Sequence, residues 1–291
     1  LGDRFLRIKV IGPTIERDTI VFSASGISIE GLGYDQLQGV LSSGSGASHG
    51  IRWNVQKPLF DLNGQSNLSF KNLLLEFTGD AKGGFTPVLG EGLQRVAFAN
   101  SGPLGVIGLT LDNIELRPAL VIDPAEYANI PQALVYFDVG LLFVDIRIKN
   151  CRTFTSDTAV YIGGNDYLDT TVLVAHDMVI EDNWFTGTWD PQYNSVANYR
   201  DVTNSFTVHL KGTRGDASFP TVNDKPEPFG GIVLAGLIQQ HIQVHRNQIQ
   251  NFAGYGIFGV TLVHSSISKN FIVACGDYGI SLGCPWAYAA A

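Results

Sequence analysis

Aromatic and carboxylate side chains are concentrated in residues 186–229, and these residue types bind and cleave sugars. The stretch holds three rings and two carboxylates with this potential: Trp189, Tyr193, Tyr199, Asp190 and Asp201. Aromatic rings pack on the apolar faces of sugars, while carboxylates bind hydroxyl groups or act as acid and base. We therefore expect a glycan-binding surface in this stretch. The alternative is that its rings form a small core of the loop itself.

Four aspartates are candidates for the acid and the base of a polysaccharide hydrolase or lyase: Asp157, Asp166, Asp190 and Asp201. Hydrolysis of a glycosidic bond needs two carboxyl groups about 5 to 9.5 Å apart. Carboxylates on neighbouring strands, about 4.8 Å apart, would meet that requirement. Solvated turn aspartates reach the same spacing by chance, so whether the protein is an enzyme stays open. Binding is the stronger expectation, because no motif fixes the catalytic pair.

A short Gly-Ile-x-Leu-like segment that recurs along the chain predicts a second part of the binding surface. It begins at Gly231, Gly256 and Gly279, and residues 159–162 are an earlier version of it. If its isoleucines face inward, one residue of each copy faces outward: Tyr161, Val233, Phe258 and Ser281. We expect this uncharged stripe to stand beside residues 186–229, so that Tyr161 and Phe258 contact the sugar together with the three rings named above.

The sequence predicts no metal site and no cofactor, although a calcium ion is left open. The three cysteines, Cys151, Cys275 and Cys284, match no metal-binding spacing. Cys275 and Cys284 could pair, and the alternative is that the cysteines are buried free thiols. His176 and His245 have no His or Cys partner at ligand spacing.

The elements that must position these residues come from one pattern that recurs seven times. Its central apolar residue, which we call h, has an apolar residue at h−2, a turn residue at h+2, a small or amide residue at h+3 and an apolar residue at h+5. The seven h positions are Ile29, Phe70, Leu111, Ile148, Ile180, Val244 and Ile267. The apolar pair with period 2 predicts a strand with one buried face, and the step to h+5 predicts a tight bend.

The spacing of the late copies predicts a solenoid. The step from Asn247 to Asn270 and the step from Gly256 to Gly279 are both 23 residues. One coil would therefore hold about three short strands, and such a coil must stack on its neighbours to bury its apolar face. Asn183, Asn247 and Asn270 all stand at h+3, which predicts a ladder of side-chain amides at one bend. Longer spacings elsewhere predict loop insertions, the largest at about 186–229.

Three segments resemble coils of the pectin-lyase-like superfamily, which includes pectate lyases, polygalacturonases and phage tailspikes. They are residues 146–151 (IRIKNC), residues 242–247 (IQVHRN) and the opening residues 19–31. The resemblance implies an all-β fold, a right-handed parallel β-helix, over residues 1–291 as a single domain. It does not assign the chemistry, because the calcium-binding acids with an Arg or Lys base, or the clustered Asp, of those enzymes are missing from the outward stripe.

Composition limits the partners. The net charge of −8 and the pI of about 5.1 disfavour a nucleic-acid binder, which needs a basic surface. No apolar run reaches the ~18 residues of a membrane helix. Together with the candidate sugar-binding residues, the resemblance implies an extracellular, cell-surface or virion-surface protein that binds, and in one version depolymerises, a polysaccharide or surface glycan. The alternative is a structural or adhesive β-helix that makes protein contacts, and a homo-oligomer is an open option.

Overall fold

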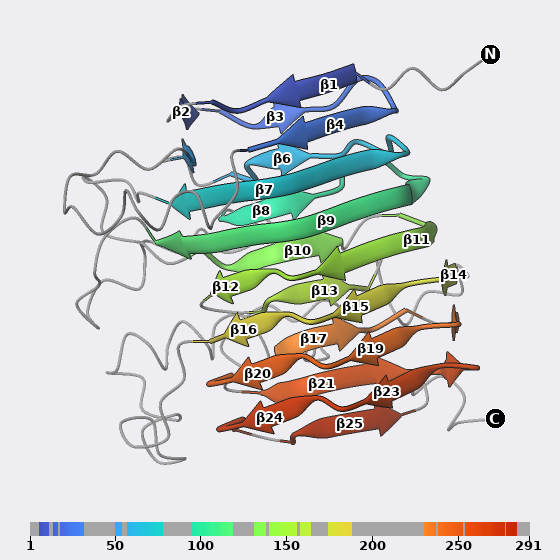
Figure 1. Ribbon diagram of the computed structural model, residues 1–291. Helices are drawn as coiled ribbons and strands as arrows, with labels where there is room; N and C mark the ends of the chain where they lie inside the picture. Colours follow the sequence, from blue (N-terminus) through green and yellow to red (C-terminus); the bar gives the residue numbers. More distant parts are fainter. Residues whose placement is uncertain are drawn as a thin grey trace, which may run out of the picture.

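The computed structural model describes residues 6–11, 14–16, 18–31, 50–53, 57–77, 95–118, 131–137, 140–155, 158–163, 174–187, 230–236, 238–252, 254–276 and 278–283. In these residues the protein is all-β: its strands form two sheets in which every pairing is parallel, and no helix occurs among them (Figure 1). None of these segments is therefore a helix that could cross a membrane. An all-parallel arrangement of this kind is consistent with a parallel β-helix.

The larger sheet has 17 strands. They are β1 (Leu6–Lys9), β2 (Thr14–Glu16), β4 (Ile27–Glu30), β5 (Ile51–Trp53), β7 (Leu68–Phe77), β9 (Gly105–Pro118), β11 (Leu142–Lys149), β12 (Arg152–Phe154), β14 (Val174–His176), β15 (Val179–Glu181), β16 (Trp184–Thr186), β18 (Ile238–Gln240), β19 (Gln243–His245), β20 (Gln248–Gln250), β22 (Leu262–Val263), β23 (Ser266–Ser268) and β24 (Phe271–Val273).

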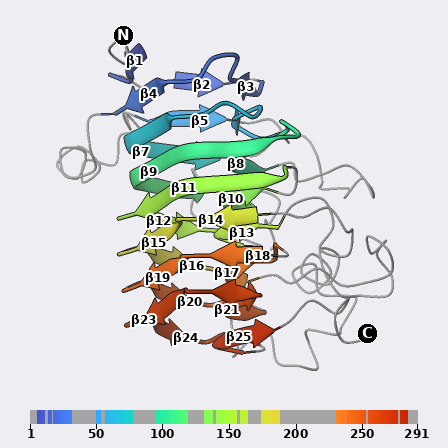
Figure 2. The same ribbon diagram turned by 90° about the vertical axis from the view of Figure 1, so that its right-hand side faces the viewer.

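The smaller sheet has eight strands, and each pairs with the next one along the chain. They are β3 (Ile20–Val21), β6 (Phe60–Asp61), β8 (Val96–Ala99), β10 (Ala133–Phe137), β13 (Val160–Ile162), β17 (Gly230–Leu234), β21 (Tyr255–Val260) and β25 (Ile280–Gly283). Strands of the larger sheet come between them in sequence. The chain therefore passes from one sheet to the other and back, and each pass forms a layer on the previous one (Figures 1 and 2).

The register between layers follows the repeat found in the sequence. Val244 lies beside Ile180 on one side and beside Ile267 on the other, so consecutive h residues are direct neighbours. Most h side chains are fully buried, among them Phe70, Leu111, Ile148, Ile180 and Val244. Burial of such a face is the main favourable contribution to folding. The predicted period-2 strands with one buried face are thus confirmed.

The core lies between the two sheets and is rich in aromatic residues in the early layers. The rings of Phe60 and Phe98, from neighbouring strands of the smaller sheet, stack with centroids 5.1 Å apart. Phe70 of the larger sheet meets Phe98 edge-on at 4.7 Å. Contacts of this kind join the two sheets into one continuous apolar core.

The bend predicted after each h residue is confirmed, and it has the same backbone conformation in every described layer from β7 onward. The residues at h+2 all have φ between 54° and 57°: Asn72, Asn113, Asn150, Asp182, Arg246 and Lys269. Asn and Asp tolerate this left-handed region, whereas Arg and Lys do not favour it. The stacked neighbours therefore impose the bend on Arg246 and Lys269. As a result, h+1 and h+4 both point away from the core on the two sides of the bend.

Candidate functional site

Four short strands of the larger sheet, β12, β16, β20 and β24, present a partly aromatic outer face. Their central residues point inward: Thr153, Phe185, Ile249 and Ile272. Their outer residues form two columns in register, first Arg152, Trp184, Gln248 and Phe271, and beside them Phe154, Thr186, Gln250 and Val273. We call this face the platform.

Two large rings on the platform are open to solvent. Trp184 is 44% exposed and Phe271 is 62% exposed, and Gln248 lies between them in the same column. The rings are therefore two strand spacings apart, about 9.5 Å. Arg152 lies on the other side of Trp184, and its guanidinium carbon is 5.8 Å from the centre of the indole. The positive charge of Arg152 is attracted to the face of the indole ring, and this cation–π contact stabilises the position of Trp184.

A groove of about 390 Å³ runs between the platform and the row of bends. Its walls include Asn150, Arg152, Asp182, Trp184, Arg246 and Gln248. Most of its surface is polar, with amide groups that can both donate and accept hydrogen bonds. A ligand in this groove would meet an aromatic face on one side and amides and charged groups on the other.

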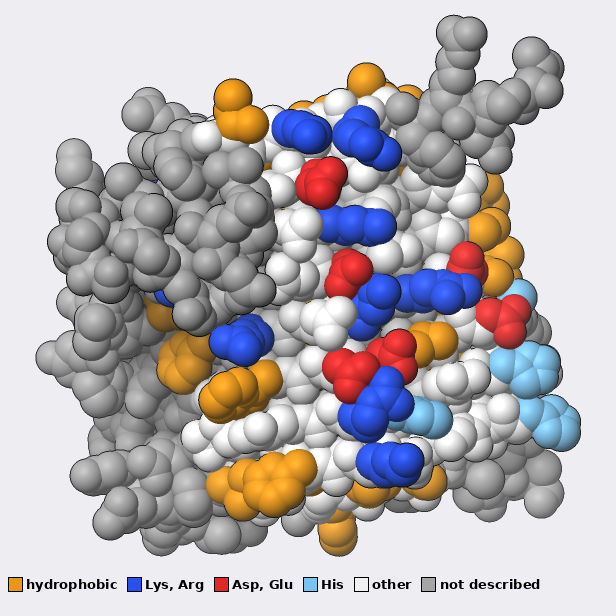
Figure 3. Space-filling model, viewed as in Figure 1, with side chains coloured by type: hydrophobic (Ala, Val, Ile, Leu, Met, Phe, Trp, Pro, Cys, Tyr) orange, Lys and Arg blue, Asp and Glu red, His pale blue; other side chains and the backbone are white. Residues whose placement is uncertain are grey.

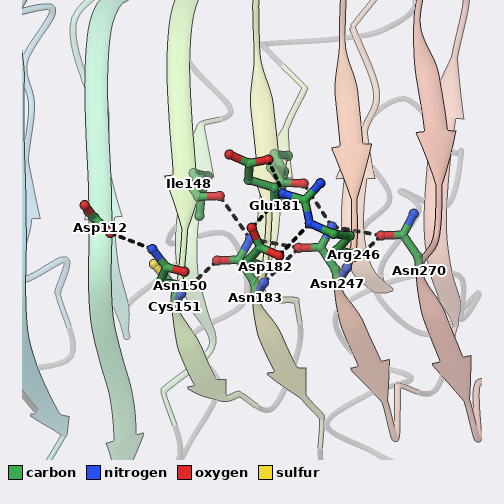
Figure 4. A network of polar contacts seen from close by, with 11 residues as sticks. Asp112, Ile148, Asn150, Cys151, Glu181, Asp182, Asn183, Arg246, Asn247 and Asn270 are labelled. Atoms are coloured by element: carbon green, nitrogen blue, oxygen red, sulfur yellow. Dashed lines mark hydrogen bonds and ion pairs between the residues drawn. The ribbon is translucent and has the colours of Figure 1, made fainter. Parts of the chain in front are cut away.

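Asn183, which lines the groove, belongs to the predicted asparagine ladder (Figure 4). The side-chain amide of Asn183 donates to Oδ1 of Asn247, and that of Asn247 donates to Oδ1 of Asn270, both at 2.9 Å. The other amide hydrogens go to backbone carbonyls, as from Asn183 to Ile148 at 3.0 Å. The ladder reaches Cys151, whose backbone N–H donates to Asn183 Oδ1 at 2.8 Å. These bonds confirm the ladder, and they satisfy buried amides that would otherwise destabilise the fold.

The carboxylates on the rim of the groove are held by one arginine. Arg246 donates to both oxygens of Asp182, at 2.8 and 2.7 Å, and to Glu181 at 2.7 Å (Figure 4). The hydrogen bond from Arg246 lowers the pKa of Asp182 below its ordinary value. Asp182 is therefore ionised at neutral pH, which suits the anchoring of Arg246 and does not suit a general acid.

A second pair of carboxylates lies further along the outer columns of the platform, towards β7. Glu76 is almost fully buried and accepts hydrogen bonds from Arg52 at 2.7 Å and from Arg117 at 2.8 Å. Arg117 also reaches Glu115, at 3.2 Å. Burial raises the pKa of Glu115, and the positive charges of Arg117 and Arg152 oppose that rise. Glu115 stands directly beside Arg152 in the column that continues to Trp184.

The predicted outward stripe exists, but it lies on the other sheet and is open to solvent only in part. Tyr161, Val233, Phe258 and Ser281 are neighbours in register across β13, β17, β21 and β25. Tyr161 and Val233 are buried, and Tyr161 stacks on Tyr136 with centroids 4.3 Å apart. Phe258 is half-buried and its ring lies 5.0 Å from that of Tyr255. Sugar contacts by Tyr161 and Phe258 stay predictions.

The other candidate residues lie outside the described part of the chain. They are Asp157, Asp166, Trp189, Asp190, Tyr193, Tyr199 and Asp201. Of the stretch 186–229, only Thr186, at the end of β16, and Gly187 are described. The proposed convergence of two aspartates therefore stays untested. Among the described residues, no three His, Cys, Asp or Glu side chains are grouped so that they could hold a metal ion.

The platform was missed in the sequence, although a signal for it is present. Trp184 and Phe271 both stand at h+4, an outward position that is not one of the recurring types in the repeat of apolar, turn and amide residues. Arg152 and Gln248 occupy the same position in their layers. The signal in the sequence is therefore the type of residue at h+4 in successive layers, since these four residues form one column.

Comparison with known proteins leaves the family open. A scan against protein-family models found no match, and neither did searches of curated proteins and of solved structures.

Proposed function

We propose that the chain is a right-handed parallel β-helix of the pectin-lyase-like type that binds a linear polysaccharide outside a cell or on a virion surface. The fold part of the proposal is supported by the two all-parallel sheets, the 23-residue step from Val244 to its neighbour Ile267, and the amide ladder at one bend. The binding part is supported by the platform.

The observation that carries the binding proposal is the exposure of Trp184 and Phe271 on a rigid face. Aromatic stacking contributes about 0.5–1.5 kcal/mol per ring pair beyond area burial, and a ring against a sugar face is comparable. Two rings about 9.5 Å apart match the length of an extended disaccharide. A linear glycan would therefore run across the strands, parallel to the stacking direction, and place alternate sugars on the two rings.

The polar side chains of the platform supply the second requirement of a sugar site. Gln248 lies between the two rings, and Gln250 lies beside it in the neighbouring column. Their amides can donate to and accept from the hydroxyl groups of the intervening sugar. Strands hold these groups more firmly than loops would, so less conformational entropy is lost on binding.

We assign binding and not cleavage to the groove. Asp182 lines the groove, is ion-paired with Arg246 and has a lowered pKa, so it does not suit a general acid, and Glu181 is paired with the same arginine. The candidates for a hydrolase or lyase activity remain Asp157, Asp166, Asp190 and Asp201.

A structural or adhesive role is the second candidate, and the two ends of the stack favour it. In the first layer, Leu6 is 59% exposed and Ile8 is 42% exposed. In the last layer, Ile280 is 48% exposed and Leu282 is 59% exposed. Among the described strands, β1 pairs only with β4, and β25 pairs only with β21. Apolar strands with an open edge bind other chains readily.

The experiment is a glycan array followed by titration of the best polysaccharide with three variants. If the platform binds the sugar, Trp184→Ala and Phe271→Ala weaken binding about tenfold each, since each loses stacking and buried area. Phe258→Ala is the matched control, because it removes a ring of similar size from the stripe on the other sheet. Loss of binding in Phe258→Ala alone would move the site to that stripe.

A failure of all glycans to bind, together with a protein partner that stays associated through purification, would support the structural role. Product analysis is the last step. Reducing ends or unsaturated sugars that disappear in Asp→Asn variants of the four candidate aspartates would establish an enzyme.

A further inference from the structure

A column of charged residues of alternating sign runs down the outer face of the larger sheet (Figure 3). It occupies the h+1 position of six successive layers, in the order Lys9, Glu30, Lys71, Asp112, Lys149 and Glu181. Each member lies directly beside the next in register. The next two positions are His245 and Ser268, so the alternation of formal charges ends with Glu181.

Within one molecule, the alternation places opposite charges on neighbouring strands, about 4.8 Å apart. Lys149 Nζ lies 3.5 Å from Asp112 Oδ2. Exposed pairs of this kind stabilise a fold only slightly, because water and salt screen them. The alternation also gives this face a regular pattern of charges. A second surface with the opposite pattern would be electrostatically complementary to it.

An alternating column with an even number of charges is complementary to its own reversed copy. Two copies can meet face to face with a twofold axis parallel to the strands or parallel to the column. The first arrangement reverses one column, so Lys71 meets the partner's Asp112, Glu30 meets the partner's Lys149, and Lys9 meets the partner's Glu181. The second arrangement aligns the columns and places like charges opposite each other. Such contacts exclude a docking mode more strongly than opposite charges favour one.

We propose that this face is the contact surface of a homodimer in which the two columns run in opposite directions. The twofold axis passes between Lys71 and Asp112, where β7 and β9 pair. A contact of this type is isologous, so every pair of opposite charges occurs twice. The proposal concerns the sheet face at h+1 and does not depend on glycan binding at the platform.

The residues at h−1, which precede the h residue in each strand, fit the same arrangement. Reversal of the column places Ser69 opposite the partner's Thr110, Ser28 opposite the partner's Arg147, and Arg7 opposite the partner's Val179. The register that fixes these rows is the one that fixes the charges. No two like charges meet in either row. Ser69 and Thr110 also have hydroxyl groups, which can both donate and accept hydrogen bonds.

The expected dimer is weak and sensitive to salt. Six strands span about 24 Å along the column, which gives a contact face at the small end of specific interfaces. Charge complementarity sets orientation and association rate more than affinity. We therefore expect sedimentation equilibrium to show dimers of the full chain at about 0.02 M ionic strength, with the dissociation constant about tenfold or more higher at about 0.5 M, because the Debye length becomes much shorter.

A pair of charge reversals provides the decisive test. In the Lys71→Asp variant, and equally in the Asp112→Lys variant, the central contacts of the homodimer become like-charged, and each variant alone should be monomeric. Mixed together, the two variants restore both central contacts in the heterodimer, because opposite charges again meet in both places.

 The new carboxylate at position 71 of one chain then meets the new ammonium group at position 112 of the other. The native Asp112 of the first chain likewise meets the native Lys71 of the second.

Recovery of dimers in the mixture, with each variant monomeric by itself, supports the proposal, since altered stability within one chain cannot produce it. Circular dichroism checks that each variant folds, and Lys71→Glu with Asp112→Arg gives a second pair of charge reversals if one does not. A wild-type chain that is monomeric at low salt up to about millimolar concentration, which is weak even for a transient contact, would overturn the proposal. Dimers that are indifferent to both reversals would overturn it as well.

Discussion

Asn247 donates its side-chain amide to Asn270 Oδ1, 2.9 Å away in the next layer, and to the carbonyl of Ile180, also at 2.9 Å, in the previous layer. One side chain therefore connects three consecutive passes of the chain at a single bend. Its own oxygen accepts from both Asn183 N and Asn183 Nδ2. The ladder satisfies the backbone at positions where the bend leaves no strand partner.

Replacement of Asn247 by Leu should destabilise the protein by about 1–3 kcal/mol, because it leaves buried donors and acceptors without partners. Thermal and urea unfolding would measure the loss. Gln243→Leu is a suitable control, since Gln243 is exposed on the adjacent strand β19. Equal stability of Asn247→Leu and the control would contradict the structural role of the ladder.

Arg246→Gln should raise the pKa of Asp182 towards its ordinary value, because the hydrogen bond from Arg246 is the main cause of the depression. With a folded pKa below the unfolded one, the pair stabilises the fold above the unfolded pKa of about 3.9 and loses this effect as pH falls through the folded pKa. The stability change at pH 7 should be small, since both side chains are largely exposed.

An NMR titration of the carboxyl carbon of Asp182 would measure this shift. Lys269→Gln changes the same bend position in the next layer and should leave the titration as it is. A pKa of Asp182 that does not move in Arg246→Gln would show that another group holds the carboxylate.

Glu115→Gln should become more stable relative to the wild type as pH rises from about 4 to about 7. Burial raises the folded pKa of Glu115 above its unfolded value of about 4.3. Below the unfolded pKa, Glu115 is protonated in both states and its ionisation does not affect the stability of the wild type. The wild type then loses stability as pH rises through the folded pKa, whereas the Gln side chain of the variant does not titrate. Melting temperatures of both proteins across this range test the sign. A constant difference between them would argue against burial as the main effect.

Cys151 should be inert to thiol reagents in the folded protein. It is fully buried, and burial raises its pKa to about 12. Cys275 is half-buried and has a pKa raised to about 11. In a Cys284→Ser background at about pH 8, where only thiolates react, we expect slow labelling of Cys275 and none of Cys151.

Guanidinium should make both thiols reactive. Cys151→Ala is the matched control, because any slow labelling that it keeps in the folded protein belongs to Cys275. Fast labelling of Cys151 without denaturant would indicate that the layers open near the ladder.

The repeat could be read from the sequence because each layer buries the same positions. Ile180, Val244 and Ile267 occur at one place in the pattern, and they are direct neighbours in the sheet. Burial selects apolar residues strongly, so these positions are visible without any structure. The three ladder asparagines are visible for the same reason, since only an amide serves both of its neighbours.

The platform and the charged column were harder to predict, because outward positions tolerate many residue types. Trp184 and Phe271 have Gln248 between them, so their column shows no single residue type. Their relation depends on register, which fixes Trp184 beside Gln248 and Gln248 beside Phe271. The stripe around Tyr161 was predicted with the correct facing, but its burial depends on tertiary packing that a local pattern does not contain.

The 23-residue step between β19 and β23 makes the stack modular, because one such step adds one layer. The number of charged layers in turn decides whether the column matches its own reversed copy. Duplication of the layer between Asn247 and Asn270 would lengthen the protein by one strand spacing, about 4.8 Å, and leave the column of six charges untouched. Addition of one layer that continues the alternation at an end of that column would change the number of charges from even to odd, and an odd alternating column meets like charges when reversed. Insertion of two layers would restore the match. A lineage of such proteins that keeps the reversed contact is therefore expected to change the length of its charged column in steps of two.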